Sequence, residues 1–303
     1  MRTGEQAVVP RAEIRSYYDR PVLKPPVWKW YIPAYYFAGG LGGAASTLAW
    51  AARLRGNLSL ARRARLISLA GIAVSPVLLI ADLGRPARFY NMLRVAKPTS
   101  PMSMGTWLIT VFGPLCGAAA VSDLTGLFPG LGRLSEAVAG LLGPAVSTYT
   151  AVLTSDSAIP AWHEAWRELP FVFAGGSAAS AGAAAVLVTP AAKAGPARNL
   201  TVVGGLLELA ADKAMEERLG ELAQPYHSGA ASRPAKGAKA LLAGGAALVA
   251  LGGRRHPGVS RAGAAMAIAG VALTRWAVFK AGFESAEDPK FTVKPQRERL
   301  VGG

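Results

Sequence analysis

A phenol and a carboxylate lie two helical turns apart in the stretch YTAVLTSD, residues 149–156. At that spacing Tyr149 and Asp156 share one face of a helix, and Pro160 ends the helix soon afterwards. Such a pair can hydrogen-bond a carbonyl or hydroxyl oxygen and exchange protons with it. The pattern predicts a site for a small molecule with such oxygens. The alternatives are an interhelical hydrogen bond for Tyr149 and an ordinary helix-end acid at Asp156.

Two further ionisable residues stand inside long apolar stretches of the C-terminal half. Glu208 lies in VVGGLLELAADK, with Asp212 one turn later on the same face, and Arg275 lies in VALTRWAVFK. An ionisable group at membrane depth is costly and by default marks function. Two interpretations stay open. Glu208 and Arg275 either neutralise each other and lock this half of the chain, or form part of a proton path.

The segment at residues 79–107 puts acids, bases and prolines between two apolar runs. Asp82 and Arg85 follow the first run closely, and Pro86 prevents that helix from continuing. An arginine so near hydrocarbon is satisfied by a lipid phosphate or by a fixed carboxylate. If the partner is a carboxylate, Asp82 and Asp156 are the nearest candidates, provided that the second and fourth spans are neighbours.

Eight apolar runs must position these residues. The mean hydropathy of +0.29 and the 51% hydrophobic composition exceed what a soluble domain needs. A helix that crosses the hydrocarbon needs about 20 mostly apolar residues. We predict an all-α integral membrane protein with eight transmembrane helices, at about 30–52, 64–82, 104–122, 134–155, 169–190, 197–215, 238–253 and 260–281. The seventh run is short, so seven spans are the alternative.

Eight spans divide the polar segments between two sides of the membrane. One side, called side A, receives residues 1–27, 83–103, 156–168, 216–237 and 284–303. Side A holds nearly all the acids, whereas the short loops of the opposite side B are rich in arginine. Lys and Arg near span ends set orientation, and here they favour neither side. The first 27 residues are a polar arm without the apolar core of a signal peptide.

Small and aromatic residues are distributed as membrane helices require. The stretches FAGGLGGAAS and FAGGSAASAGAAAV would allow helix backbones to approach closely. Trp28 and Trp30 lie at the start of the first span, and Trp162 and Trp166 lie just before the fifth. We expect these tryptophans to form an interfacial belt.

Several classes of protein are excluded. The single cysteine, Cys116, rules out a thiolate-held metal cluster within this chain, so we expect no iron–sulfur centre and no metal site. The three histidines, His163, His227 and His256, fall in predicted loops, so we expect no haem. Charges sit in short clusters between apolar runs, which disfavours nucleic-acid binding. No nucleotide-binding or HExxH motif is present.

The chain resembles the NrfD/PsrC family, the membrane subunits of polysulfide reductase-like molybdenum enzymes. The resemblance rests on DLGRPARFYNML, PTSPMSMGTW, YTAVLTSDSAIPAWHEAWRELPFVF, GGLLELAADK and LTRWAVFKAGFESAEDPK. It implies two four-helix bundles, at 28–156 and 157–283, followed by a tail at 284–303. It also implies a site for menaquinone or ubiquinone in the first bundle, built by Tyr31, Tyr35, Tyr36, Asp82, Arg85, Tyr149 and Asp156.

The same resemblance implies partners. A four-cluster iron–sulfur subunit would carry electrons between the quinone and a molybdopterin catalytic subunit, at the cell inner (plasma) membrane. We expect Arg88, Arg94 and His163, all on side A, to contact it, with headgroup binding as the alternative for the arginines. The substrate of the catalytic subunit and the direction of electron flow stay open. A small-solute or ion transporter and a purely structural anchor are the alternative functions.

Overall fold

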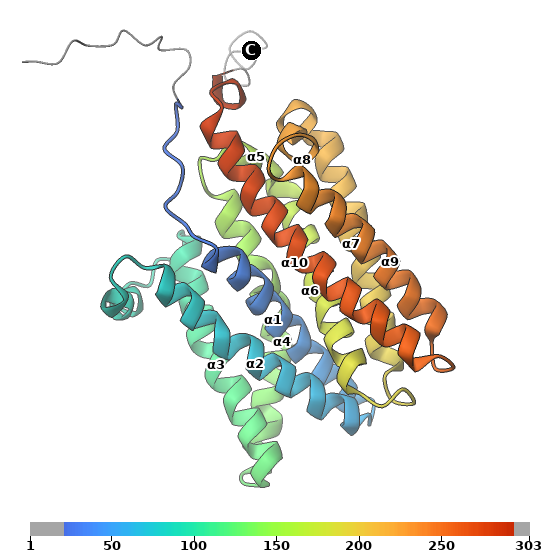
Figure 1. The fold of residues 1–303 in the computed structure, drawn as a ribbon. Coiled ribbons are helices and arrows are strands. Elements are labelled where there is room, and N and C mark those ends of the chain that lie inside the picture. Colours follow the sequence, from blue (N-terminus) through green and yellow to red (C-terminus); the bar gives the residue numbers. More distant parts are fainter. Residues whose placement is uncertain (1–20, 294–303) are drawn as a thin grey trace, which may run out of the picture.

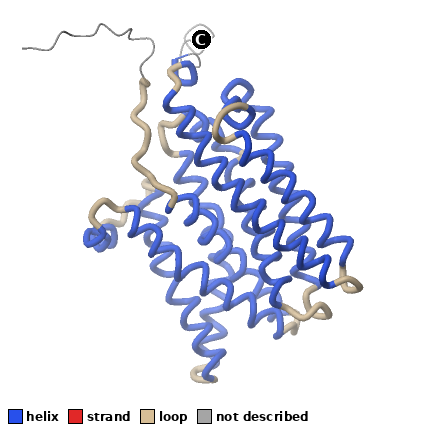
Figure 2. The backbone as a smooth tube through the Cα atoms, in the orientation of Figure 1, coloured by secondary structure: helices blue, strands red, loops and turns tan. Residues whose placement is uncertain are grey.

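The computed structural model describes residues 21–293, which are largely helical and contain no strand in that range (Figure 1, Figure 2). Eight of the described helices have twenty residues or more: α1 (Tyr31–Leu54), α2 (Leu58–Asp82), α3 (Pro101–Thr125), α4 (Pro129–Ser155), α6 (Leu169–Val188), α7 (Gly195–Leu219), α9 (Ser232–Gly252) and α10 (Pro257–Glu287). Short helical segments connect them: η2 (Pro86–Arg94), α5 (Pro160–His163), η3 (Glu164–Arg167), η4 (Gly220–Ala223) and α8 (Gln224–His227). Most of the expected arm and part of the expected tail lie outside the described residues.

Six of the long helices are long and apolar enough to cross a membrane: α2, α3, α4, α6, α9 and α10. The other two are less apolar. Helix α1 contains three tyrosines and four glycines, and α7 ends in the charged stretch AADKAMEERL. The protein is therefore an all-helical, multi-pass membrane protein.

Proline and capping residues set where several helices begin and end. Helices α3, α4 and α10 each start with a proline, because its fixed φ suits the first turn and its missing N–H is not needed there. The Asn57 side chain accepts a hydrogen bond from the Leu60 amide at 3.2 Å and caps α2. Gly126, with a left-handed φ of 75°, ends α3. These residues thereby determine where the charged residues near the helix ends lie.

We call α1 to α4 the N-terminal group and α6, α7, α9 and α10 the C-terminal group. In the N-terminal group, α1 and α3 each contact both α2 and α4; in the C-terminal group, α6 and α9 each contact both α7 and α10. The groups meet along a seam where α1 contacts α6 and α10. Glycines allow close approach: a Cβ added at Gly71 would lie 2.7 Å from the Ala38 carbonyl oxygen. Backbone contact of this kind is how membrane helices gain packing energy.

The connections separate into the two expected sides. Figure 1 shows the end of α10 and the segments α5 and α8 at one end of the molecule, which is side A, and the start of α1 lower, beside the middle of α10. The turns between α1 and α2, α3 and α4, α6 and α7, and α9 and α10 lie at the opposite end, side B. Helix η2 follows α2 and projects sideways from the body.

The expected aromatic belt is wrong for one tryptophan. Trp162 is 0% exposed, and its indole Nε1 donates a hydrogen bond to the Val278 carbonyl at 2.7 Å. Its ring stacks on Trp28 at 5.5 Å, and a side chain at Gly282 of α10 would overlap it. Trp162 therefore fastens the segment before α1 and the loop before α6 onto α10. Trp30 and Trp166 are each 55% exposed, as a belt requires.

Candidate functional site

Three tyrosines gather near side A, where α1 meets α4. Tyr35 and Tyr36 are each 1% exposed, and the Tyr35 ring centroid lies 6.3 Å from those of both Tyr36 and Tyr149. Thr154 donates a hydrogen bond to the Tyr36 hydroxyl at 2.9 Å. The Tyr35 hydroxyl is buried and has no hydrogen-bond partner among residues 21–293. The cluster thus presents one buried phenol that can still donate and accept.

Apolar residues surround the tyrosine cluster. Leu78, Leu79, Ile109 and Tyr149 pack against the core that contains Tyr35 and Tyr36. Helix α3 approaches through Gly105, where an added side chain would overlap the Tyr149 ring. Apolar side chains therefore enclose the three tyrosine rings.

Asp82 ends α2 beside the start of α1. Its carboxylate accepts a hydrogen bond from the Lys29 backbone amide at 2.9 Å. The Asp82 carboxylate lies close enough to Tyr36 for its negative charge to interact with the Tyr36 phenol. Tyr31 is half-buried in the first turn of α1, with its ring centroid 4.4 Å from that of Trp30. Asp82 therefore holds the entry to α1 next to the tyrosine cluster.

The candidate ion pair of Arg85 is not formed. Arg85 is exposed and pairs with neither Asp82 nor Asp156 in the described part of the chain. The reason is the path of the backbone, because Arg85 stands at the start of η2, which leaves the helical body. Asp156 is likewise exposed and ends α4, while Tyr149 is half-buried two turns earlier. Tyr149 thus joins the tyrosine cluster, and Asp156 faces solvent on side A.

The three predicted docking residues are exposed on side A. Arg88 and Arg94 belong to η2, whose Phe89 and Tyr90 are 43% and 53% exposed. His163 is also exposed, and its ring Nδ1 lies 3.1 Å from the Ser155 carbonyl at the end of α4. Basic and aromatic side chains therefore share this projecting surface.

Glu208 and Arg275 are buried in the C-terminal group, each 1% exposed. They make no direct ion pair in the described structure. The negative charge of Glu208 nevertheless interacts with the Arg275 guanidinium at longer range. One guanidinium nitrogen, Nη2, donates to the Phe173 carbonyl at 2.9 Å, and the guanidinium lies 4.1 Å from the Phe173 ring centroid. Both Glu208 oxygens, and Nε and Nη1 of Arg275, lack hydrogen-bond partners among residues 21–293.

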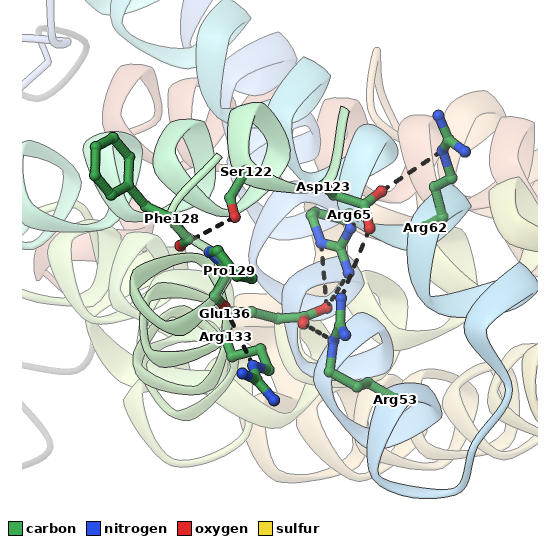
Figure 3. Close-up of polar contacts among 9 residues, drawn as sticks. All are labelled: Arg53, Arg62, Arg65, Ser122, Asp123, Phe128, Pro129, Arg133 and Glu136. Atoms are coloured by element: carbon green, nitrogen blue, oxygen red, sulfur yellow. Dashed lines mark hydrogen bonds and ion pairs between the residues drawn. The ribbon is translucent and has the colours of Figure 1, made fainter. Parts of the chain in front are cut away.

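Sequence reasoning missed a network of charges at side B, drawn in Figure 3. Two nitrogens of Arg65 donate to Glu136 Oε1, at 2.7 and 3.2 Å, and Arg53 donates to the other oxygen. Arg65 also lies 2.7 Å from Asp123, which a second arginine, Arg62, approaches at 3.5 Å. Arg65 and Glu136 are both 3% exposed. The network joins the side B ends of α1, α2, α3 and α4.

The signal for this network was present in the sequence but ambiguous. Arg65 and Glu136 are charged residues within predicted helices, yet both lie close enough to a loop to be taken as loop charges. Their pairing depends on α2 and α4 turning the right faces toward each other. Spacing along one helix does not contain that information.

No group of three His, Cys, Asp or Glu residues suited to a metal ion occurs among the residues that the structure describes. Cys116 is buried, with its sulfur 3.4 Å from the Ser68 hydroxyl.

Comparison with known proteins gives one family. A search of curated proteins finds no match. The model of the family described as polysulphide reductase, NrfD, matches residues 21–222, which is most of the chain. The matched region contains α1 to α7, and so includes the tyrosine cluster, η2 and Glu208. The chain belongs to the polysulphide reductase NrfD family.

Proposed function

We propose that this chain is the quinone-reactive membrane subunit of a polysulphide reductase-like complex. All eight long helices would cross the cell inner membrane, as two four-helix bundles. The observation that carries the proposal is the buried, unpartnered Tyr35 hydroxyl within an apolar cluster near side A. The family match supports the complex and gives no support to a transporter.

The residues of the cluster fit a quinone headgroup. A quinone has two carbonyl oxygens on a flat apolar ring, and the cluster offers a phenol donor among aromatic and aliphatic walls. When bound, the quinone supplies the redox chemistry, which takes two electrons and two protons. Tyr35 would hold one carbonyl oxygen by a hydrogen bond. Tyr149 would orient the ring, and Tyr36 is itself held in place by Thr154.

Carboxylates near the same end would exchange protons with water. Asp156 is exposed on side A, and Asp82 lies beside the entry to α1. Tyr31, in the first turn of α1, and Arg85, which follows α2, would line the mouth of the site. A carboxylate that meets water can pass protons to a quinone site without crossing the bilayer.

Electrons must come from another chain, because the sequence provides no group that stores them. We propose that a four-cluster iron–sulfur subunit docks on side A, over η2, with Arg88, Arg94 and His163 at the contact. A molybdopterin subunit would follow it. The exposed mixture of aromatic and basic side chains on η2 supports a protein contact.

The test is the variant Tyr35→Phe in the purified complex. Removing one neutral hydrogen bond should raise the KM for a quinol roughly two- to tenfold. The matched control is Tyr226→Phe, since the Tyr226 hydroxyl is likewise buried without a partner among residues 21–293 but belongs to α8. Equal KM values for the two variants, with intact assembly, would remove Tyr35 from the site.

Glu208 and Arg275 suggest a second role within the same complex. A carboxylate and a guanidinium with unpartnered atoms, deep in the C-terminal group, support a place on a proton path. We propose that Glu208 is the proton-exchanging group and that Arg275 sets its local charge.

A further inference from the structure

Helix α7 presents a row of acids on one face. Glu208, Asp212 and Glu216 follow one another at four-residue spacing, so they rise along the helix by about 6 Å per step. Glu208 is 1% exposed and Asp212 is 7% exposed, and the Glu216 side chain is 12% exposed. The opposite face carries Glu217, whose side chain is 68% exposed. The inward row therefore leads from the end of α7 on side A toward its middle.

The outer end of this row is open to solvent on side A. The Lys239 ammonium of α9 lies 3.0 Å from Asp212 Oδ2 and 2.7 Å from Glu216 Oε2, so it links the two acids. His227 Nε2 lies 3.9 Å from the same Glu216 oxygen, and its side chain is 60% exposed. Polar groups thus continue from water to Asp212.

The inner end of the row is the Glu208–Arg275 site. Both side chains lie around Gly176 of α6: an added Cβ there would overlap Glu208 Oε2 and lie 2.6 Å from Arg275 Nη2. Glycine at position 176 thus lets the Glu208 carboxylate and the Arg275 guanidinium lie against the α6 backbone. Buried charged atoms without partners are very costly, and water satisfies such atoms when several polar groups surround it. The atoms of Glu208 and Arg275 that lack partners among residues 21–293 are therefore available to such a water molecule or to a proton.

Toward side B the same face of α7 is closed. A Cβ added at Gly204 would lie 2.7 Å from the Gly175 carbonyl oxygen, and one at Gly182 would lie 2.6 Å from the Thr201 amide nitrogen. The Thr201 hydroxyl donates to a carbonyl of its own helix at 2.9 Å. Backbone contacts this close leave no room for a water molecule between α6 and α7.

We infer that these groups form a proton-access path that opens on side A alone and ends at Glu208. The inference rests on the proposed role of Glu208 in proton exchange. The groups that face Glu208 are known from each neighbouring helix: Asp212 on α7 itself, Arg275 and the Thr274 hydroxyl on α10, and Lys239 on α9 by way of Asp212. Helix α6 contains no ionisable residue. Protons would therefore reach Glu208 through Asp212.

The experiment measures which compartment controls protonation of Glu208. The complex is reconstituted in vesicles in one orientation, and a hydrophobic carbodiimide, which adds to protonated carboxyl groups, is supplied in the bilayer. Mass spectrometry then quantifies modification of Glu208 after acidification of one side at a time. Acidification on side A should increase the modification, and acidification on side B should leave it unchanged.

Two variants test whether the path runs through Asp212 and ends beside Gly176. Asp212→Asn should abolish the response of Glu208 to side A, whereas the control Glu217→Gln, on the exposed face, should keep it. Gly176→Ala should also abolish the response, because the added methyl group would overlap the Glu208 carboxylate and displace it from the end of the row. A response to side B would overturn the inference and keep Glu208 as a proton-exchanging group. Absence of modification from either side would overturn both, and would leave the Tyr35 result for the quinone site unaffected.

Discussion

Two buried acid–arginine pairs differ in one respect. Arg65 and Glu136 are each 3% exposed, and Glu208 and Arg275 are each 1% exposed, so burial does not distinguish them. Arg65 and Glu136 make two direct hydrogen bonds, whereas Glu208 and Arg275 make none to each other in the described structure. Hydrogen bonding therefore separates a pair that is bonded across helices from the pair for which we propose proton exchange.

The physical reason lies in the cost of burying charge. A buried ion pair is tolerated when direct hydrogen bonds replace the lost water, and breaking it leaves an uncompensated charge. The Glu136 carboxylate is bonded through both oxygens to arginines, so its loss would leave those guanidinium groups without their acceptor. The Glu208 carboxylate has no such bonds, so a change of its protonation breaks little structure. Three predictions test this contrast.

Glu136→Gln should cause the largest loss of stability. The variant keeps the shape of the side chain but leaves Arg65 and Arg53 without their shared carboxylate, which should lower the free energy of unfolding by about 3–5 kcal/mol. Denaturant titration of the protein in detergent measures it. The control Glu217→Gln, at an exposed position, should change stability by less than about 0.5 kcal/mol. Equal losses would show that the side B network does not stabilise the fold.

Glu208→Gln should cost less than Glu136→Gln, because no direct hydrogen bond to an arginine is lost and only one guanidinium, that of Arg275, loses its carboxylate neighbour. The same titration measures the change. A loss as large as that of Glu136→Gln would mean that Glu208 and Arg275 are a structural lock, and the contrast between the two pairs would fail.

Arg218→Gln should have the smallest effect, at most about 1 kcal/mol, since an ion pair near the surface contributes little. Arg218 donates to both Glu168 oxygens, at 2.6 and 2.5 Å, and this hydrogen bonding holds the pKa of Glu168 below its usual range. A lowered folded-state pKa stabilises the protein above the ordinary pKa of glutamate, and the stabilisation is lost as the pH falls through the folded-state value. The difference in Tm between wild type and variant should therefore shrink on acidification. A difference that is constant with pH would contradict this origin.

Much of the candidate site was recoverable from sequence because its signals are local. Tyr149 was expected on a helix face near a helix end, and it lies two turns before the end of α4 in contact with Tyr35. Asp82 was expected after an apolar run, and it ends α2. Arg85 pairs with neither Asp82 nor Asp156 in the described structure. Its position depends on the path of η2, which the sequence does not reveal. Burial of Trp162 was missed because it depends on Gly282, over a hundred residues later in the chain.

The sequence by itself determined the helical membrane class, the positions of the long helices and the family, because hydropathy over about 20 residues and local motifs are properties of contiguous chain. Only the tertiary structure decided which buried charges are bonded. Arg65 meets Glu136, and Glu208 faces Arg275 across Gly176, because glycine contacts fix which faces of the helices touch. Partners on different helices are set by packing in three dimensions, and hydropathy along one helix does not encode them.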